Sequence, residues 1–136
     1  MEINKDIFLS GTNIRLSDLQ NPNDYYSTTE VKTNKIWTDG RPIYRIVMYK
    51  NVNSVGECIV DCPSGFRECT EYDAYSIYAD GSQIPLPRVE ISYSTGNAYS
   101  SIVLLTPSSW IGRNTFYIVG APTDSRVKII LEYTKN

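Results

Sequence analysis

Alternation of apolar and polar residues over short runs is the feature that most limits how this chain can fold. The clearest run covers residues 126–134, where every second residue is large and apolar: Val127, Ile129, Leu131 and Tyr133. A period of two residues is typical of a half-buried strand. Residues 89–93 alternate in the same way, and the turn-forming Ser-Thr-Gly-Asn at 94–97 predicts a hairpin to residues 98–105.

Helical periodicity is almost absent, so we expect an all-β fold. A turn of helix is expected at most near residues 16–21, because Pro22 follows it. Many short runs separated by turn-forming residues favour an antiparallel β-sandwich of jelly-roll or Greek-key type. The expected strands cover residues 6–10, 30–37, 42–50, 57–61, 73–79, 88–94, 98–105, 114–120 and 126–134.

The length of 136 residues suits a single folded domain. The turn-rich Gln-Asn-Pro-Asn-Asp at 20–24 separates a first segment from the β-like remainder. We expect residues 1–24 to form an N-terminal arm for docking or oligomerisation, and residues 25–136 to form the β-sandwich domain. No apolar run approaches the length of a signal peptide core or of a membrane-spanning helix, so we expect synthesis in the cytoplasm without membrane insertion.

The charge balance argues against a nucleic-acid partner. The net charge is −2 at neutral pH and the isoelectric point is about 5.1. Nucleic-acid-binding domains usually carry a basic surplus, and the basic residues here are scattered without a cluster that could hold phosphates.

Residues 37–42, Trp-Thr-Asp-Gly-Arg-Pro, predict a tight turn between two strands. Gly40 can take the positive φ that such a turn needs, and Pro42 suits the first residue of a strand. Both faces of the following strand are apolar: Ile43, Val47 and Tyr49 share one face with Arg45, and Tyr44, Ile46 and Met48 occupy the other. Either the strand is covered on both sides, by a partner sheet and by the N-terminal segment or another subunit, or one face is exposed.

The residue inventory gives little support for catalysis, and we do not expect an enzyme. The chain has no histidine, which excludes Ser-His-Asp and Cys-His catalysis and most zinc sites. Carboxylates gather at residues 57–73 and could serve a glycoside hydrolase, although a charged loop is the commoner explanation for such a cluster. No sequence motif for binding a nucleotide or another cofactor is present, so no cofactor is expected.

Three cysteines lie close together in the sequence, at Cys58, Cys62 and Cys69. Their spacing is not that of a structural zinc site, and their odd number does not fit a disulfide framework. Three alternatives stay open: free or buried thiols, one disulfide in which Cys62 and Cys69 close their loop, and a metal site. We expect no metal.

Several segments together resemble a pattern found in tail-fibre and baseplate-associated structural proteins of bacteriophages and prophages. They are Tyr-Ser-Thr-Thr-Glu at 26–30, Trp-Thr-Asp-Gly-Arg-Pro-Ile-Tyr-Arg at 37–45 and Glu-Tyr-Thr-Lys at 132–135, with weaker similarity at 84–87, 89–97 and 109–112. The resemblance covers residues 25–135, and the segments 57–69 and 121–125 depart from it. It implies architectural roles for Trp37, Asp39, Gly40, Pro42, Tyr44, Trp110 and Tyr133, with Trp110 in the core.

What the resemblance implies is a protein of the phage particle surface, made in the bacterial host cytoplasm. The function expected first is that of a tail-fibre or baseplate receptor-binding domain that recognises a host-surface glycan or protein. Such proteins assemble with copies of themselves, often as homotrimers, with other virion proteins, and with host polysaccharide. Aromatic rings that stack on sugars and an arginine that binds hydroxyl groups form the expected ligand-binding set: Tyr72, Tyr75, Tyr78, Tyr99 and Arg113.

Two other functions compete with this one. A capsid-decorating protein, a head fibre or a tail adaptor would have a purely structural role, and the short length without a shaft repeat favours it. Its tyrosines would then mediate subunit contacts. The third function is a glycan-degrading module that uses the carboxylates at residues 57–73.

Overall fold

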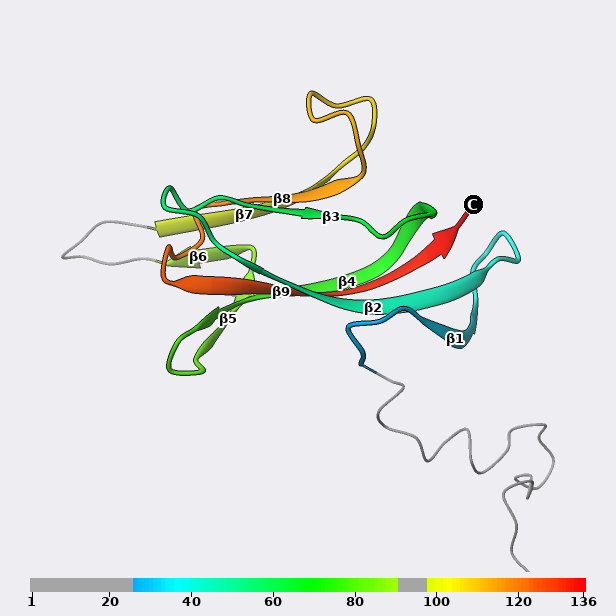
Figure 1. Ribbon diagram of the computed structural model, residues 1–136, viewed down its shortest axis with the longest axis horizontal. Coiled ribbons are helices and arrows are strands. Elements are labelled where there is room, and N and C mark those ends of the chain that lie inside the picture. Colours follow the sequence, from blue (N-terminus) through cyan, green and yellow to red (C-terminus); the bar gives the residue numbers. More distant parts are fainter. Residues whose placement is uncertain (1–25, 91–97) are drawn as a thin grey trace, which may run out of the picture.

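The chain folds into two antiparallel sheets packed face to face, as the computed structural model in Figure 1 shows. The structure describes residues 26–90 and 98–136, and no helix occurs within them. The predicted all-β sandwich is therefore confirmed. The expected arm at 1–24, the strand at 6–10, the helical turn at 16–21 and the hairpin turn at 94–97 lie outside the described residues.

The strands divide unequally between the two sheets. The five-stranded sheet has the order β1 (Val31–Ile36), β2 (Pro42–Asn51), β9 (Ser125–Lys135), β4 (Phe66–Tyr78) and β5 (Gln83–Leu86). The four-stranded sheet has the order β3 (Cys58–Asp61), β8 (Thr115–Val119), β7 (Ala98–Leu105) and β6 (Arg88–Glu90). Every paired strand runs antiparallel to its neighbour.

Strand β9 supplies the centre of the core. Its alternate residues are completely buried, as the sequence pattern predicts: Val127, Ile129, Leu131 and Tyr133. They face Phe116 and Ile118 of β8, which are also without exposed surface. Because β9 is paired on both sides, with β2 and with β4, it holds the five-stranded sheet together while its side chains join that sheet to the other.

Two strand segments were not expected from the sequence. Strand β5 contains Pro85, but it lies at the edge of its sheet, where a residue without an N–H group is tolerated. Strand β4 begins at Phe66 rather than at residue 73, because residues 66–72 pair with the end of β9. Irregularities in register at 66–68 and 69–71 disturb the alternation there, which is why the sequence pattern does not reveal it.

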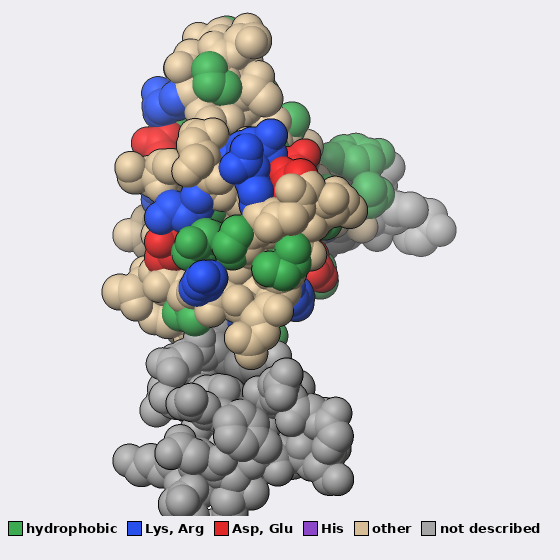
Figure 2. Space-filling view, turned by 90° about the vertical axis from the view of Figure 1, so that its right-hand side faces the viewer, with side chains coloured by type: hydrophobic (Ala, Val, Ile, Leu, Met, Phe, Trp, Pro, Cys, Tyr) green, Lys and Arg blue, Asp and Glu red, His purple; other side chains and the backbone are tan. Residues whose placement is uncertain are grey.

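The turn between β1 and β2 forms as predicted and is anchored to the start of β4. Gly40 has a φ of +84°, its N–H donates to the Trp37 carbonyl at 2.9 Å, and Pro42 is the first residue of β2. The Trp37 indole N–H donates to Glu68 at 2.5 Å, and Arg67 donates to the Asp39 carboxylate at 2.6 Å. Charged side chains of both signs accordingly lie side by side on this end of the molecule (Figure 2).

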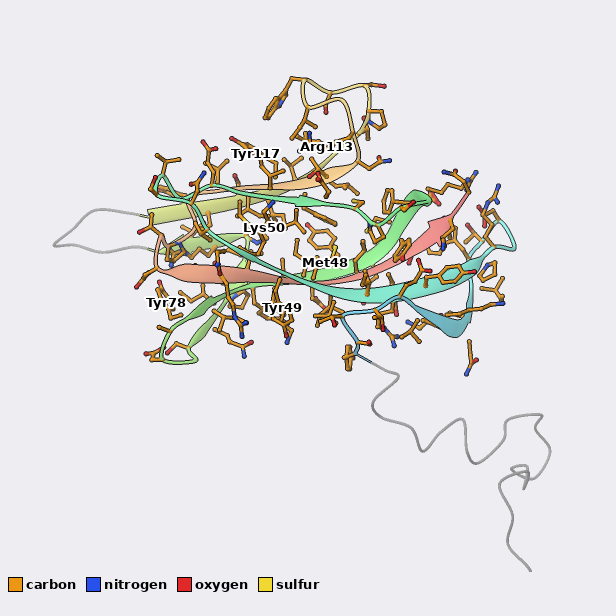
Figure 3. All side chains as sticks on the ribbon, viewed as in Figure 1. Met48, Tyr49, Lys50, Tyr78, Arg113 and Tyr117 are labelled. Carbon is orange, nitrogen blue, oxygen red and sulfur yellow. The ribbon has the colours of Figure 1, made fainter. Side chains whose placement is uncertain are left out.

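Strand β2 is covered on both faces over residues 43–48, as the first of the two interpretations expects, whereas Tyr49 is 43% exposed. Tyr44, Ile46 and Met48 pack against the core, and Figure 3 shows Met48 between the sheets and Tyr49 on the opposite side of β2. On that outer side Ile43, Arg45 and Val47 are also buried. The segment before β1 runs beside them, since the Val47 N–H donates to the Ser27 carbonyl at 2.9 Å.

The prediction that Trp110 lies in the core is wrong. Its side chain is 73% exposed, and its indole meets the Tyr117 ring edge to face at 5.4 Å. Residues 106–114, between β7 and β8, project from the sandwich (Figure 1), so they carry the indole away from the interior. Phe66, Phe116 and Tyr133 supply the buried aromatic rings instead.

Shortening a side chain at the centre of β9 should weaken the fold. Leu131→Ala is expected to lower the free energy of unfolding by about 2–5 kcal/mol, because it removes buried surface and leaves a cavity. Urea denaturation followed by circular dichroism measures the change. Val55→Ala, at a side chain that is 70% exposed, is the control and should change stability little. Equal effects of the two substitutions would contradict the assignment of the core.

Removing one buried hydroxyl group should make the fold more stable. Ser76 points inward from β4 opposite Val127, and its Oγ is buried without a hydrogen-bond partner among the described residues. A buried polar group without a partner costs free energy. We expect Ser76→Ala to raise the free energy of unfolding by about 1 kcal/mol in the same urea assay. A less stable variant would show that the hydroxyl is satisfied.

Candidate ligand-binding surface

The outer face of the five-stranded sheet carries aromatic and charged side chains together. Cross-strand register places Arg45, Val47 and Tyr49 of β2 beside the outward residues of β9, which are Glu132, Ile130 and Lys128. On the other side of β9, strand β4 contributes Glu71, Asp73 and Tyr75 to the same face. The segment before β1 adds Tyr26 at the surface of this sheet.

Two hollows adjoin on this face and share Tyr26 and Ile130 as walls. The first, of about 260 Å³, also contains Thr28, Val47, Tyr49 and Lys128. The second, of about 220 Å³, lies among Arg45, Lys35 and the carboxylates of Glu71, Asp73 and Glu132. One hollow is therefore mainly apolar and aromatic, and its neighbour is strongly polar.

An ion cluster of buried Arg45 and Glu132 with the half-exposed Lys35 lines the polar hollow. The Arg45 guanidinium donates to Glu132 Oε1 from Nη2 at 2.7 Å and from Nε at 3.2 Å. Lys35 Nζ donates to both oxygens of the same carboxylate, at 2.9 and 3.0 Å. Arg45 also lies 5.4 Å from the centre of the Tyr26 ring, a cation–π distance. The cluster therefore compensates the Glu132 charge and helps to position Tyr26.

These contacts set the titration of Glu132. Burial alone would raise the pKa of its carboxyl, but the hydrogen bonds and positive charges of Lys35 and Arg45 outweigh burial, so the pKa lies below its ordinary value. Glu132 thus stays ionised in the folded protein at neutral pH. Protonation of Glu132 would remove its ion pairs with Lys35 and Arg45, so the folded state should become less stable in acid.

Glu71 and Asp73 differ from Glu132 because neither carboxylate bonds to another described residue. Glu71 lies directly opposite Glu132 in the register of β4 and β9, so two like charges face each other across neighbouring strands. Like charges in this position are unfavourable. Both carboxylates are exposed at the rim of the polar hollow, where they can accept hydrogen bonds from a bound molecule.

The residues predicted to bind ligand do not form one site. Tyr75 shares the outer face of the five-stranded sheet, opposite Lys128. Tyr72 points toward the other sheet, 5.2 Å from the Phe116 ring, and Tyr78 lines a separate hollow of about 590 Å³ with Asn51, Asp124 and Arg126. Tyr99 lies on the outer face of the four-stranded sheet. Arg113 lies in the projecting loop and donates to Asp61 at 2.6 Å.

Tyr26 and Tyr49 were missed as site residues. Alternation along residues 42–50 places Tyr49 on the same face as Arg45 and Val47, but it does not tell which face is turned away from the core. Tyr26 reaches the site only because its segment runs beside β2. Glu132 could be found only through its register with Arg45 and Glu71.

The three cysteines are free thiols, and Cys58 is buried. Burial raises the pKa of Cys62 to about 12 and that of Cys69 to about 11, so both thiols stay protonated at neutral pH. A protonated thiol is a poor nucleophile and a poor metal ligand. Within residues 26–90 and 98–136, no group of three or more Cys, Asp or Glu side chains is arranged to hold a metal ion.

Comparison with known proteins gives no family for the chain. No protein-family model matches it, and neither a curated protein nor a solved structure matches it significantly. In the described part of the chain, no helix is long and apolar enough to cross a membrane. The resemblance to phage structural proteins therefore stays a prediction.

Replacing Glu132 should change how stability depends on pH. A carboxyl whose pKa is lowered by folding stabilises the folded state above its ordinary pKa of 4.5, and this contribution is lost as the pH falls below that value. Glu132→Gln should therefore be less stable than the original protein at pH 7 and should lose less stability between pH 5 and pH 3. Thermal unfolding at a series of pH values measures both effects.

Glu71→Gln is the matched control for this prediction, since it makes the same change on the neighbouring strand. It removes a like charge opposite Glu132, so it should not lower stability at pH 7. If both variants were equally destabilised at pH 7, the ion cluster would not be the cause.

Proposed function

We propose that the chain is a structural protein of a bacteriophage particle whose β-sandwich binds a saccharide of the host surface. The observation that carries this proposal is the pair of adjoining hollows around Tyr26, in which aromatic walls meet the carboxylates of Glu71 and Asp73, which no other described residue binds. The sequence resemblance described above supports the class of protein, and the hollows supply a place for the ligand.

The chemistry of the two hollows suits a sugar. A pyranose ring has an apolar face of C–H groups and a rim of hydroxyl groups, so it needs an aromatic wall and several hydrogen-bonding groups. Tyr26 and Tyr49 offer the rings and are 62% and 43% exposed. Glu71 and Asp73 can accept hydrogen bonds from hydroxyl groups, and Lys128 can donate one. Val47 and Ile130 close the floor with apolar surface.

The size of the hollows indicates weak binding at each site. Each is smaller than the ~300–1,000 Å³ typical of pockets for small molecules and cofactors. They suit one or two sugar rings that stay partly in water. Many copies on one particle would convert such weak contacts into firm attachment, because the second and later contacts form at high effective concentration.

A purely structural role, as a capsid-decorating protein, head fibre or tail adaptor, is the second candidate. The outer face of the four-stranded sheet favours it, because strands β7 and β8 contain no charged residue. Charge-poor surfaces with aromatic side chains are typical of the centres of protein interfaces. This face and the hollows lie on opposite sides of the sandwich, so one protein can have both functions.

Tyr26→Ala tests the saccharide site. A panel of purified bacterial surface polysaccharides identifies a bound glycan, and calorimetry with a short oligosaccharide from it gives the affinity. We expect Tyr26→Ala to weaken binding by at least about tenfold, or ~1.4 kcal/mol, through loss of the stacking ring. Tyr99→Ala is the control, because Tyr99 is 61% exposed, almost as much as Tyr26, but lies on the opposite face.

The contrary results are equally clear. Binding that depends on Tyr99 and not on Tyr26 would place the site on the other sheet. A chain that binds none of the polysaccharides, but binds a purified protein of the particle, would favour the structural role.

A further inference from the structure

The outer face of the five-stranded sheet changes in charge along strand β9. Cross-strand register aligns the outward residues of β2, β9 and β4 in four rows, which are Arg45–Glu132–Glu71, Val47–Ile130–Asp73, Tyr49–Lys128–Tyr75 and Asn51–Arg126–Ile77. The first two rows hold three carboxylates, and the last two hold Lys128 and Arg126 without a carboxylate. At ~3.3 Å per residue, the rows extend over ~20 Å. The face therefore has an acidic end and a basic end.

The two cations of the basic end have no carboxylate partner among the described residues. Lys128 lies between Tyr49 and Tyr75 of the neighbouring strands. The Arg126 guanidinium lies 4.7 Å from the centre of the Tyr49 ring, a cation–π distance, and its N–H groups bond to no described residue. The cations at the other end, in contrast, are already paired with Glu132. The positive charge of the basic end is therefore available to a negatively charged ligand.

A larger hollow continues the face beyond its basic end. It has a volume of about 590 Å³, and its walls include Arg126, Tyr78 and Asp124. Because Arg126 also lies against Tyr49, a wall of the hollow that Lys128 lines, the two hollows are neighbours. No ion pair joins Asp124 to Arg126 in the described part of the chain. The charge of Asp124 favours an anion on the side of Arg126 that faces Lys128.

We propose that this face binds a linear acidic saccharide along β9, with a negatively charged group of one sugar at Lys128 and Arg126. The inference rests on the saccharide binding proposed above, to which it adds the charge and the direction of the ligand. Arginine presents parallel N–H donors that match two oxygens of a carboxylate or a phosphate group. Tyr49 and Tyr75 flank Lys128, so their rings can cover the C–H face of the same sugar.

The acidic end explains why a saccharide suits this face better than another polyanion. Glu71 and Asp73 would repel a negatively charged group, but they can accept hydrogen bonds from hydroxyl groups. A saccharide satisfies both ends, because each ring carries hydroxyl groups and only some rings carry a charge. An acidic peptide or an anionic lipid surface would instead place negative charge against the carboxylates. The same repulsion fixes the direction in which the saccharide lies.

Removing the charge of the ligand tests the proposal with the complete chain. The probes are oligosaccharides several rings long, prepared from each polysaccharide that the binding panel identifies. Each is measured by calorimetry in its native form, after reduction of its carboxyl groups to alcohols, and after removal of its phosphate groups. We expect the native form to bind at least about tenfold more tightly than the uncharged form, through loss of charge-assisted hydrogen bonds. The two treatments distinguish a carboxylate from a phosphate.

Replacing both cations should abolish this preference. Arg126→Gln combined with Lys128→Gln should weaken binding of the native form at least about tenfold and leave binding of the uncharged form nearly unchanged. Retained binding of the uncharged form also shows that the variant is folded. Lys32→Gln is the matched control, because it makes the same change of charge at an exposed residue of the same sheet that lines none of the three hollows. It should keep the preference for the native form.

The possible failures of this inference and of the proposed function are distinguishable. A glycan that binds through Tyr26 but is neutral, or that keeps its affinity when its charge is removed, would overturn the inference and leave the saccharide site in place. Binding of no polysaccharide at all would overturn both. If the variant without Arg126 and Lys128 still preferred the native form, the charged group would lie elsewhere and the assignment to these two residues would be wrong.

Discussion

Strand β9 is the element on which the rest of the structure depends. Its inward side chains fill the core against Phe116 and Ile118, and its backbone pairs with both β2 and β4. Its outward Glu132 gathers Arg45 and Lys35 into the ion cluster that helps to position Tyr26. One strand therefore links the two sheets, completes the larger sheet and supports the candidate ligand site, so that the fold and the proposed site share residues.

The two outer faces of the sandwich have different physical characters. The face of the five-stranded sheet is hollowed and combines tyrosine rings with charged groups, some of which have no partner among the described residues. The face of β7 and β8 is uncharged and open. Water solvates the first face well and the second poorly, which is why the first is assigned to a hydroxyl-rich ligand and the second to protein. A sandwich keeps these two surfaces apart by the thickness of its core.

The fold followed from the sequence more closely than the site did. Two predictions were correct: the last strand, from the alternation along residues 126–134, and the Asp-Gly turn before Pro42. Both depend on local backbone geometry. Strand β5 was missed because tolerance of Pro85 depends on an edge position that pairing alone creates. Trp110 was placed in the core because the resemblance gives it an architectural role, but its loop leads away from the sandwich. The predicted ligand residues, four tyrosines and Arg113, lie on different faces, and only Tyr75 shares the surface proposed here.

By itself, the sequence determined that this chain is an all-β protein, where its main turn lies and which residues of its last strand are buried. Those properties depend on neighbours along the chain, so a pattern of period two is enough to reveal them. Tertiary structure decided that Glu132 meets Arg45 and Lys35, that Tyr26 lies beside β2, and that Trp110 is exposed. The partners of Glu132 are separated from it by 87 and 97 residues, and the register of the strands alone brings them together.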